Sequence, residues 1–358
     1  MTAVLTGIDF VLPDALAAHE PPEARGLARD EVKLMVSRVT DDVIVNTGFF
    51  RFPDFLEAGD VLVVNTSATI NAAFPAIRET LGGIKCRVSL HLSTPISEGR
   101  WVVELRRNSR KGTTPLLDAE RGETLLLPGG ASARLVEPCI AGDFLSGKVR
   151  LWIAELQLPV DVLAYSDRYG SPIRYSYVPR QWPLSYYQTV FSKEPGSVEM
   201  PSAARAFTDD VVARLEQKGV TIVPILLHTG VSSLESDEPP YPEFYRVTPS
   251  AARAVNEARA RGGRIVAVGT TAVRAVESAA SRDGEVQARE GWTDLVVTPE
   301  RGVWAVDGIL TGFHAPRASH LMMLETFASS DHLSLAYDNA LSEGYLWHEF
   351  GDLHLIMP

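Results

Sequence analysis

The second half of the chain alternates helical segments with buried strands. In "FTDDVVARLEQKGVTIVPILLHTG" (207–230), a helical pattern ends at Gly219 and an apolar run leads to His228. The segment "TPSAARAVNEARARGGRIVAVGTTAVRAVES" (248–278) repeats this plan, with Thr248 as the expected helix N-cap. Helices that alternate with buried strands predict a parallel or mixed sheet covered by helices.

Residues 74–155 have a different pattern. Short runs such as "IKCRVSLHLS", "RWVVELRRN" and "KVRLWIAEL" alternate apolar with polar residues, and glycine or proline separates them. This period of two predicts a small all-β unit, a barrel or a sandwich. We therefore expect an α/β protein: a large mixed, barrel-like α/β domain from residues 1–73 and 156–358, with a β-barrel domain, residues 74–155, inserted.

Composition limits the function classes. The chain has 358 residues, of which 45% are hydrophobic, and a formal net charge of -11. A net-acidic chain attracts nucleic acid only through a local basic patch. Only Cys86 and Cys139 occur, which favours a reducing compartment, and no apolar stretch approaches the length of a membrane span. With no secretion signal visible, we expect a soluble, cytoplasmic protein without membrane association.

Polar residues follow the predicted strands. Gly269, Thr270 and Thr271 come directly after "RIVAV", where a strand end and a helix N-terminus together favour ligand binding. Arg274 and Glu277 share one face of that helix. A capped helix with a surface ion pair would produce the same pattern.

Histidines mark two further strand ends. His228 ends "PILLH", and His314 precedes a proline turn in "LTGFHAPRASHLMML", where Ser319 begins an apolar helix. Each histidine could be a packing residue, but several such sites in one domain favour a shared cleft.

Two other segments suggest contacts to a ligand. In "YYQTVFS" (186–192), Tyr187, Gln188 and Thr189 suit the wall of a pocket for a flat base, although an aromatic core strand is an alternative. The strand-like run "YLWHEFGDLHLI" (345–356) carries His348, Glu349 and Asp352. Residues of these types can coordinate a metal ion. However, neither HExxH spacing nor a thiolate cluster occurs, so we expect no metal site.

Together these sequence segments resemble those of the S-adenosylmethionine:tRNA ribosyltransferase-isomerase family of queuosine biosynthesis. The similarity runs from "DFVLPDALAAHEPPEAR" through "RIVAVGTTAVRAVES" to "YLWHEFGDLHLI". It implies a two-domain α/β enzyme with an inserted β-barrel. It also implies that S-adenosylmethionine donates a ribosyl group to the amine of an aminomethyl-deazaguanine in tRNA. Adenine and methionine leave, and no metal takes part.

The resemblance also implies roles for individual residues. His228 and His314 would exchange protons, and Arg274 and Glu277 would orient the donor. The catalytic candidates are His228, His314, Glu277 and Asp352. The substrate-binding candidates are Tyr187, Gln188, Thr189, Pro201, Ser202, Gly230, Gly269, Thr270, Thr271, Arg274, Phe313 and Ser319.

Several positions depart from the family pattern. Ala68 and Ala73 occupy positions of family arginines, Ala206 replaces a histidine, and Glu349 stands where the family has serine in S-Y-G-D. Each lost cation weakens nucleic-acid binding. One alternative is therefore a divergent paralogue that cleaves or transfers from S-adenosylmethionine with a small-molecule acceptor. A second is a non-catalytic protein that binds an adenosyl ligand. A third is simple sequence drift, in which the nearby cations Arg174, Arg180 and Arg205 compensate for the lost family residues.

Overall fold

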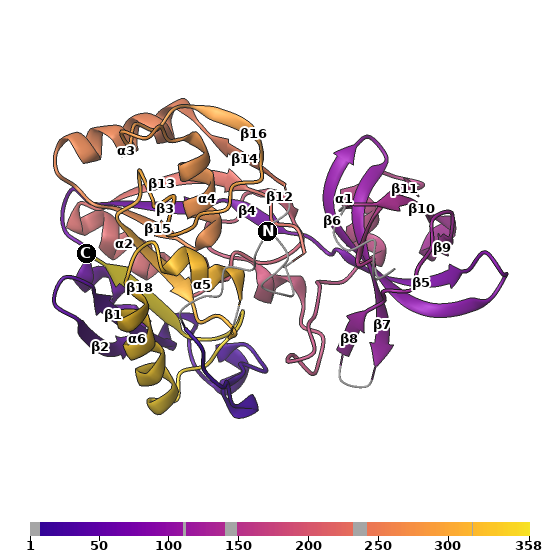
Figure 1. Cartoon of the computed structure of the whole chain (residues 1–358), viewed down its shortest axis with the longest axis horizontal. Coiled ribbons are helices and arrows are strands. Elements are labelled where there is room, and N and C mark those ends of the chain that lie inside the picture. Colours follow the sequence, from indigo (N-terminus) through magenta and orange to yellow (C-terminus); the bar gives the residue numbers. More distant parts are fainter. Residues whose placement is uncertain (1–7, 110–111, 140–148, 232–241, 317) are drawn as a thin grey trace.

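A computed structural model describes residues 8–109, 112–139, 149–231, 242–316 and 318–358. Its larger unit is built on a mixed nine-stranded sheet (Figure 1). The edges of this sheet are β16 and β2. In spatial order, the strands are β16 (Arg289–Thr293), β14 (Glu243–Val247), β13 (Thr221–Leu227), β3 (Val61–Asn65), β15 (Ile265–Val268), β17 (Gly308–Gly312), β18 (Leu353–Met357), β1 (Lys33–Arg38) and β2 (Val43–Gly48).

Both faces of the large sheet are buried. Along β3, Val61 and Val63 pack into one core, while Leu62 and Val64 pack into the core on the opposite face. This explains the unbroken apolar run, because a strand covered on both faces has no polar side. The first core includes residues of α3 (Pro249–Ala260), α4 (Thr270–Ala279), α5 (Ser319–Leu324) and α6 (Ser330–Ser342), and the second includes residues of α2 (Asp209–Lys218) and of the 3-10 turn Phe49–Phe55.

The helix ends follow the signals in the sequence. Thr208 and Thr248 accept hydrogen bonds from the backbone N–H groups of Val211 and Ala251, so both are N-caps, as expected for Thr248. Gly219 ends α2 in the left-handed conformation, with φ of 88°. These local signals place the helices between the strands.

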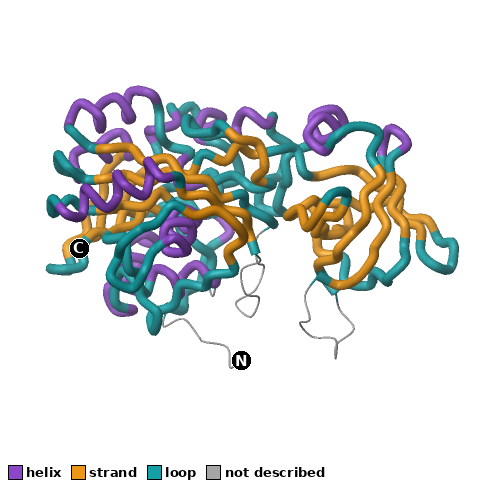
Figure 2. Tube along the Cα trace, turned by 90° about the horizontal axis from the view of Figure 1, so that it is seen from above, coloured by secondary structure: helices purple, strands orange, loops and turns teal. Residues whose placement is uncertain are grey.

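The smaller unit is a β-barrel. Strands β11, β10, β9, β5, β6 and β7 pair in turn, and pairing of β11 with β7 closes the ring; β8 extends β7. Figure 2 shows this unit beside the large sheet. The bounds are β5 (Ala73–Glu79), β6 (Lys85–Ser97), β7 (Arg100–Ser109), β8 (Gly112–Pro115), β9 (Thr124–Leu126), β10 (Ser132–Pro138) and β11 (Leu151–Gln157).

These two units confirm the predicted fold class, a large mixed α/β unit with an inserted β-barrel. The described strands of the barrel sheet begin at Ala73 and end at Gln157, and we propose residues 74–155 as the inserted domain. Helix α1 (Val162–Tyr169) packs on the barrel, where Tyr165 lies 5.3 Å from Phe74 between ring centroids. A two-stranded parallel pair, β4 (Ser67–Thr69) with β12 (Glu194–Ser197), follows the end of β3.

The strand alternative for residues 186–192 does not hold at Tyr187, which ends a 3-10 helix (Leu184–Tyr187). One local prediction was wrong. In the C-terminal run, only Leu353–Met357 is a strand. The preceding loop turns because Asp352 accepts hydrogen bonds from the backbone N–H groups of Lys33 and Leu346, at 2.8 and 2.7 Å. Within the described ranges, no helix is long and apolar enough to span a bilayer.

Asp60 should be a main stabiliser of the large sheet. Its buried carboxylate pairs with Arg264 and accepts backbone N–H bonds from Glu57 and Arg264, so it holds the starts of β3 and β15 together. We expect Asp60→Ala to lower the free energy of unfolding by about 3 kcal/mol in urea denaturation, because it leaves buried donors unpaired. Asp54→Ala, which removes an exposed pair with Arg51, should cost less than about 1 kcal/mol. Equal losses would contradict this assignment.

Candidate active site

A cavity of about 660 Å³ opens at the carboxyl ends of the central strands. Strands β13, β3, β15 and β17 run parallel, so their carboxyl ends lie at the same edge of the sheet. Residues 229–231 follow β13, residues 269–271 follow β15, and residues 311–314 end and follow β17; all of them line the cavity. This is where ligands bind in open α/β sheets, and the volume is typical of a small-molecule site.

Asn65 fixes the spacing of two of these strand ends. Its side chain accepts a hydrogen bond from the backbone N–H of Leu227 at 3.0 Å and donates to the carbonyl of Leu227 at 2.8 Å. The same amide group lies 3.4 Å from the hydroxyl of Thr271, in the first turn of α4. The end of β3 is therefore tied to β13 and to the cavity-lining helix.

Gly269 makes the turn from β15 into α4 possible. Its φ of 86° and ψ of 160° lie in a region that is essentially restricted to glycine. A Cβ atom there would lie 3.4 Å from the Cβ of Ala203. Thr270 and Thr271 then begin α4, whose first turn leaves backbone N–H groups without intrahelical partners. This wall of the cavity suits an anionic group.

Arg274 is held firmly beside this wall. Its guanidinium donates to the carbonyls of Leu295 and Thr293, each at 3.1 Å, and pairs with the carboxylate of Glu243. Glu243 also accepts the backbone N–H of Gly230 at 2.8 Å. The pairing of Glu243 with Arg274 was not predicted from the sequence.

Two imidazoles, those of His314 and His320, line the cavity. His314 and His320 stack in parallel, with 4.5 Å between ring centroids, and Nε2 of His314 lies 2.8 Å from the Thr311 hydroxyl. Burial, then the neighbouring histidines, hold the pKa of His314 well below its usual value. Burial and Arg274 lower the pKa of His320 to about 4. Both rings are therefore neutral at pH 7, and each can accept a proton or donate an N–H.

A second part of the cavity is acidic and aromatic; we call it the acidic end, formed by Tyr175, Tyr177, Glu199, His348 and Glu349. The Tyr175 hydroxyl donates to the Glu199 carboxylate, and the Tyr177 ring stacks on His348 at 4.1 Å. Burial, then the charge of Glu199, raises the pKa of Glu349 to about 8. Glu349 is therefore largely protonated at neutral pH.

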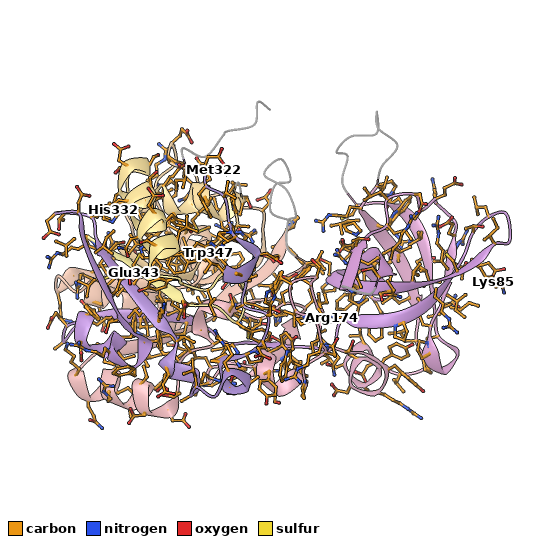
Figure 3. All side chains as sticks on the ribbon, turned by 90° about the horizontal axis from the view of Figure 1, so that it is seen from below. Lys85, Arg174, Met322, His332, Glu343 and Trp347 are labelled. Atoms are coloured by element: carbon orange, nitrogen blue, oxygen red, sulfur yellow. The ribbon has the colours of Figure 1, made fainter. Side chains whose placement is uncertain are left out.

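The acidic end also meets the barrel. The guanidinium of Arg106, in β7, lies over the Tyr175 ring at 5.6 Å. In Figure 3, the labelled Arg174, one residue before Tyr175, lies between the barrel and the large unit. Tyr175 thus contacts both parts of the protein.

The cavity brings together most of the predicted substrate-binding residues and one predicted catalytic residue. Those that line it are Pro201, Ser202, Gly230, Gly269, Thr270, Thr271, Arg274, Phe313, His314 and Ser319.

Six predicted residues lie outside the lining: His228, Glu277, Asp352, Tyr187, Gln188 and Thr189. Nδ1 of His228 bonds to the Ser67 hydroxyl at 2.7 Å, and its ring stacks on Phe244. Burial lowers the pKa of His228. Gln188 bonds in both directions with the backbone of Thr69. The functional roles of these six residues stay predictions.

Glu277 has a different environment from Arg274, although both lie on α4. Its carboxylate binds Arg301 at 2.8 Å and accepts the backbone N–H groups of Trp304 and Ala305, each at 2.9 Å. The i, i+3 spacing placed the two residues on adjacent turns. It could not distinguish a side chain that faces the cavity from one that anchors a loop.

Sequence reasoning missed the acidic end and His320. In the sequence, Glu349 stood out only as one of three residues that resemble metal ligands and as a departure from the family serine. Tyr175 and Tyr177 lie in a segment without periodicity, and Glu199 comes from the loop after β12. The one available signal was the departure at residue 349. Among the described residues, no group of three or more His, Cys, Asp or Glu side chains is arranged to hold a metal ion.

The cations considered as replacements for the family arginines differ in environment. Arg205 is buried in an ion pair with Glu23 at 2.8 Å, and Arg174 donates to the carbonyl of Val178 at 2.8 Å. Arg180 lies over the Trp182 ring at 3.9 Å and remains exposed. Of these three, Arg180 is the one with a solvent-facing charge.

Comparison with known proteins agrees with this architecture. The family model described as queuosine biosynthesis protein matches residues 5–356. The chain belongs to this family. A relative from Desulfitobacterium hafniense, named S-adenosylmethionine:tRNA ribosyltransferase-isomerase, is 34% identical, with 99% of each chain covered. One from Moorella thermoacetica with the same name is 33% identical, with 98% of each covered.

A solved structure of an enzyme with a similar name also matches this chain. The S-adenosylmethionine tRNA ribosyltransferase from Thermotoga maritima is 29% identical, with a TM-score of 0.54. The match covers 98% of this chain and all of that one. The large sheet and the barrel thus have a counterpart in the family.

Glu277→Ala should affect stability rather than ligand binding. We expect the free energy of unfolding to fall by about 3 kcal/mol, because a buried carboxylate with three partners is lost. S-adenosylmethionine affinity, measured by calorimetry on folded protein, should change less than twofold. The matched control is Glu290→Ala, at an exposed site in β16, which should change neither quantity. A tenfold loss of affinity at full stability would place Glu277 in the binding site instead.

Gly269→Ala should impair the cavity through the backbone. The required conformation costs about 1–3 kcal/mol for a non-glycine residue. Relief of this strain would displace Thr270 and Thr271. We expect S-adenosylmethionine binding to weaken about tenfold in calorimetry. Gly262→Ala, at a positive φ with open space around it and outside the cavity lining, should cost stability without affecting affinity. Equal affinity in both variants would refute the role given to Gly269.

Proposed function

We propose that this chain transfers the ribosyl moiety of S-adenosylmethionine to the aminomethyl-deazaguanine of tRNA and isomerises it, forming epoxyqueuosine and releasing adenine and methionine. The observation that carries this proposal is the family match over residues 5–356, joined to relatives of that name at nearly full length. A chain with this activity would work in the cytoplasm.

The cavity supports a place for the donor. The first turn of α4 and the guanidinium of Arg274 supply positive potential for the methionine carboxylate. Thr270 and Thr271 add hydroxyl groups at the same end. The volume of about 660 Å³ leaves room for a flat base beside the donor.

His314 is the proposed proton-exchanging group for the donor. A sulfonium acidifies the adjacent ribose carbon, and the departing adenine needs a hydrogen-bond donor near its ring. A neutral imidazole serves either purpose, and burial keeps His314 neutral. Its bond to Thr311 fixes the orientation of the ring. His320, stacked on it, extends the same surface.

A small-molecule acceptor is the second candidate. It is favoured by Ala68 and Ala73, which remove two family cations, and by the buried ion pair that occupies Arg205. Loss of phosphate-binding cations weakens tRNA affinity and its salt dependence.

The test is release of adenine from S-adenosylmethionine, followed by chromatography, with tRNA carrying aminomethyl-deazaguanine or with the free base. We expect release with the tRNA, and His314→Ala should slow it by about 10²–10⁴-fold. His332→Gln, in α6 and outside the cavity lining, is the control and should retain the rate. Release with the free base alone, together with no tRNA binding at low salt, would favour the small-molecule acceptor. Binding of S-adenosylmethionine without adenine release under either condition would favour a non-catalytic protein.

A further inference from the structure

The acidic end of the cavity has the composition of a site for a primary ammonium group. Glu199 and Glu349 supply two carboxyl groups, and Tyr175 and Tyr177 supply aromatic faces that attract cations. Glu199 is already a hydrogen-bond acceptor for Tyr175. A cation bound here would meet both carboxyl groups and aromatic π-density.

Glu349 is incompletely satisfied. Its Oε1 atom is shielded from solvent and has no hydrogen-bond partner among the described residues. The buried hydroxyl of Tyr187 is likewise without a partner in the described part of the chain. Burial, then the charge of Glu349, raises the pKa of Tyr187. A buried carboxyl oxygen without a donor costs stability, so its retention points to a ligand that supplies the donor.

An ammonium group in the cavity could come from the donor, S-adenosylmethionine, or from the acceptor. The donor carries an amine beside its carboxylate, and the first turn of α4 with Arg274 attracts that carboxylate. Its amine then lies near Glu243, which is at the same end. The charge of Arg274 acts on His320, and His320 stacks on His314. His348, in the acidic end, acts in turn on His314. We assign the amine at the acidic end to the acceptor.

We propose that Glu199 and Glu349 bind the ammonium group of the acceptor and that the Glu349 carboxylate removes its proton, so that the amine becomes nucleophilic. This inference rests on the proposed function. In the step, an N–H bond of the ammonium breaks and an O–H bond forms on Glu349. The nitrogen keeps the electron pair and uses it for attack. The net change is the movement of one proton.

The electrostatics suit this exchange. Unperturbed primary amines have pKa values near 10, and a base effective at neutral pH needs a pKa near that pH. The pKa of Glu349, about 8, meets this requirement. Before binding, Glu349 is mostly protonated at pH 7; a bound ammonium favours the carboxylate, so the proton leaves to solvent. The ionisable groups that act on Glu349, or whose pKa its charge shifts, are Glu199, Arg205, Tyr177 and Tyr187.

The departure at residue 349 is consistent with this role. A serine, which the family pattern has there, is not a base at neutral pH. Ala206, which replaces a family histidine, lines the same small hollow as Glu349 and Phe350.

The test uses the full chain and two probes, 7-aminomethyl-7-deazaguanine and 7-methyl-7-deazaguanine, in calorimetry at pH 7 in buffers of different ionisation enthalpy. The amine should bind with release of about one proton, since a group with a pKa of about 8 is mostly protonated there. In Glu349→Gln, we expect at least tenfold weaker binding and no proton release. The methyl analogue should bind both proteins alike, as should S-adenosylmethionine. Glu343→Gln, exposed and outside the cavity lining, is the matched control.

Adenine release supplies the second readout. Glu349→Gln should slow single-turnover release by about 10²–10⁴-fold with S-adenosylmethionine affinity unchanged, and should remove the rise in rate through pH 8. Equal amine affinity and proton release in Glu349→Gln and the parent would overturn the inference, as would an unchanged pH profile. The proposed function fails separately: if the parent releases no adenine but binds the amine with proton release, the ammonium site stands and the assigned reaction does not.

Discussion

The site depends on the parallel alignment of β13, β3, β15 and β17. Because these strands run in one direction, their carboxyl ends open at a single edge, and Asn65 holds two of them in register with α4. At the opposite end of the same strands, Asp60 and Arg264 fix the start of the sheet. The cavity lies between segments that are far apart in the sequence because each follows or contacts one of these strands.

Charge is distributed unevenly along the cavity. Arg274, paired with Glu243, and the first turn of α4 lie in one part of the cavity, and Glu199 and Glu349 provide carboxyl groups in another. The imidazoles of His314 and His320 also line the cavity, and they are neutral because burial lowers their pKa values. A donor with a carboxylate and an acceptor with an ammonium group would therefore be ordered along the cavity by electrostatics.

Much of the fold was predictable from local patterns. Thr208 and Thr248 are helix caps, and the apolar run at Val61–Asn65 is a strand buried on both faces. The strand ends at Gly269 and His314 were also found, since a glycine or a histidine after an apolar run is visible in a sequence.

The rest of the site depended on tertiary packing. Glu277 and Arg274 have equivalent positions in the helical pattern, but one anchors residues 301–305 and the other lines the cavity. His228 ends its strand as predicted, yet its ring turns toward Ser67. The acidic end combines loops around residues 175, 199 and 349, and no local periodicity connects these.

The contact of Tyr175 with Arg106 has a mechanical consequence. One face of the tyrosine is covered by a barrel guanidinium, while its hydroxyl is bound to Glu199 in the cavity. The barrel and the acidic end are therefore not independent modules: a rotation of the barrel would shift a carboxylate-bound ring. A macromolecule that grips the barrel from outside could alter the geometry around an amine within.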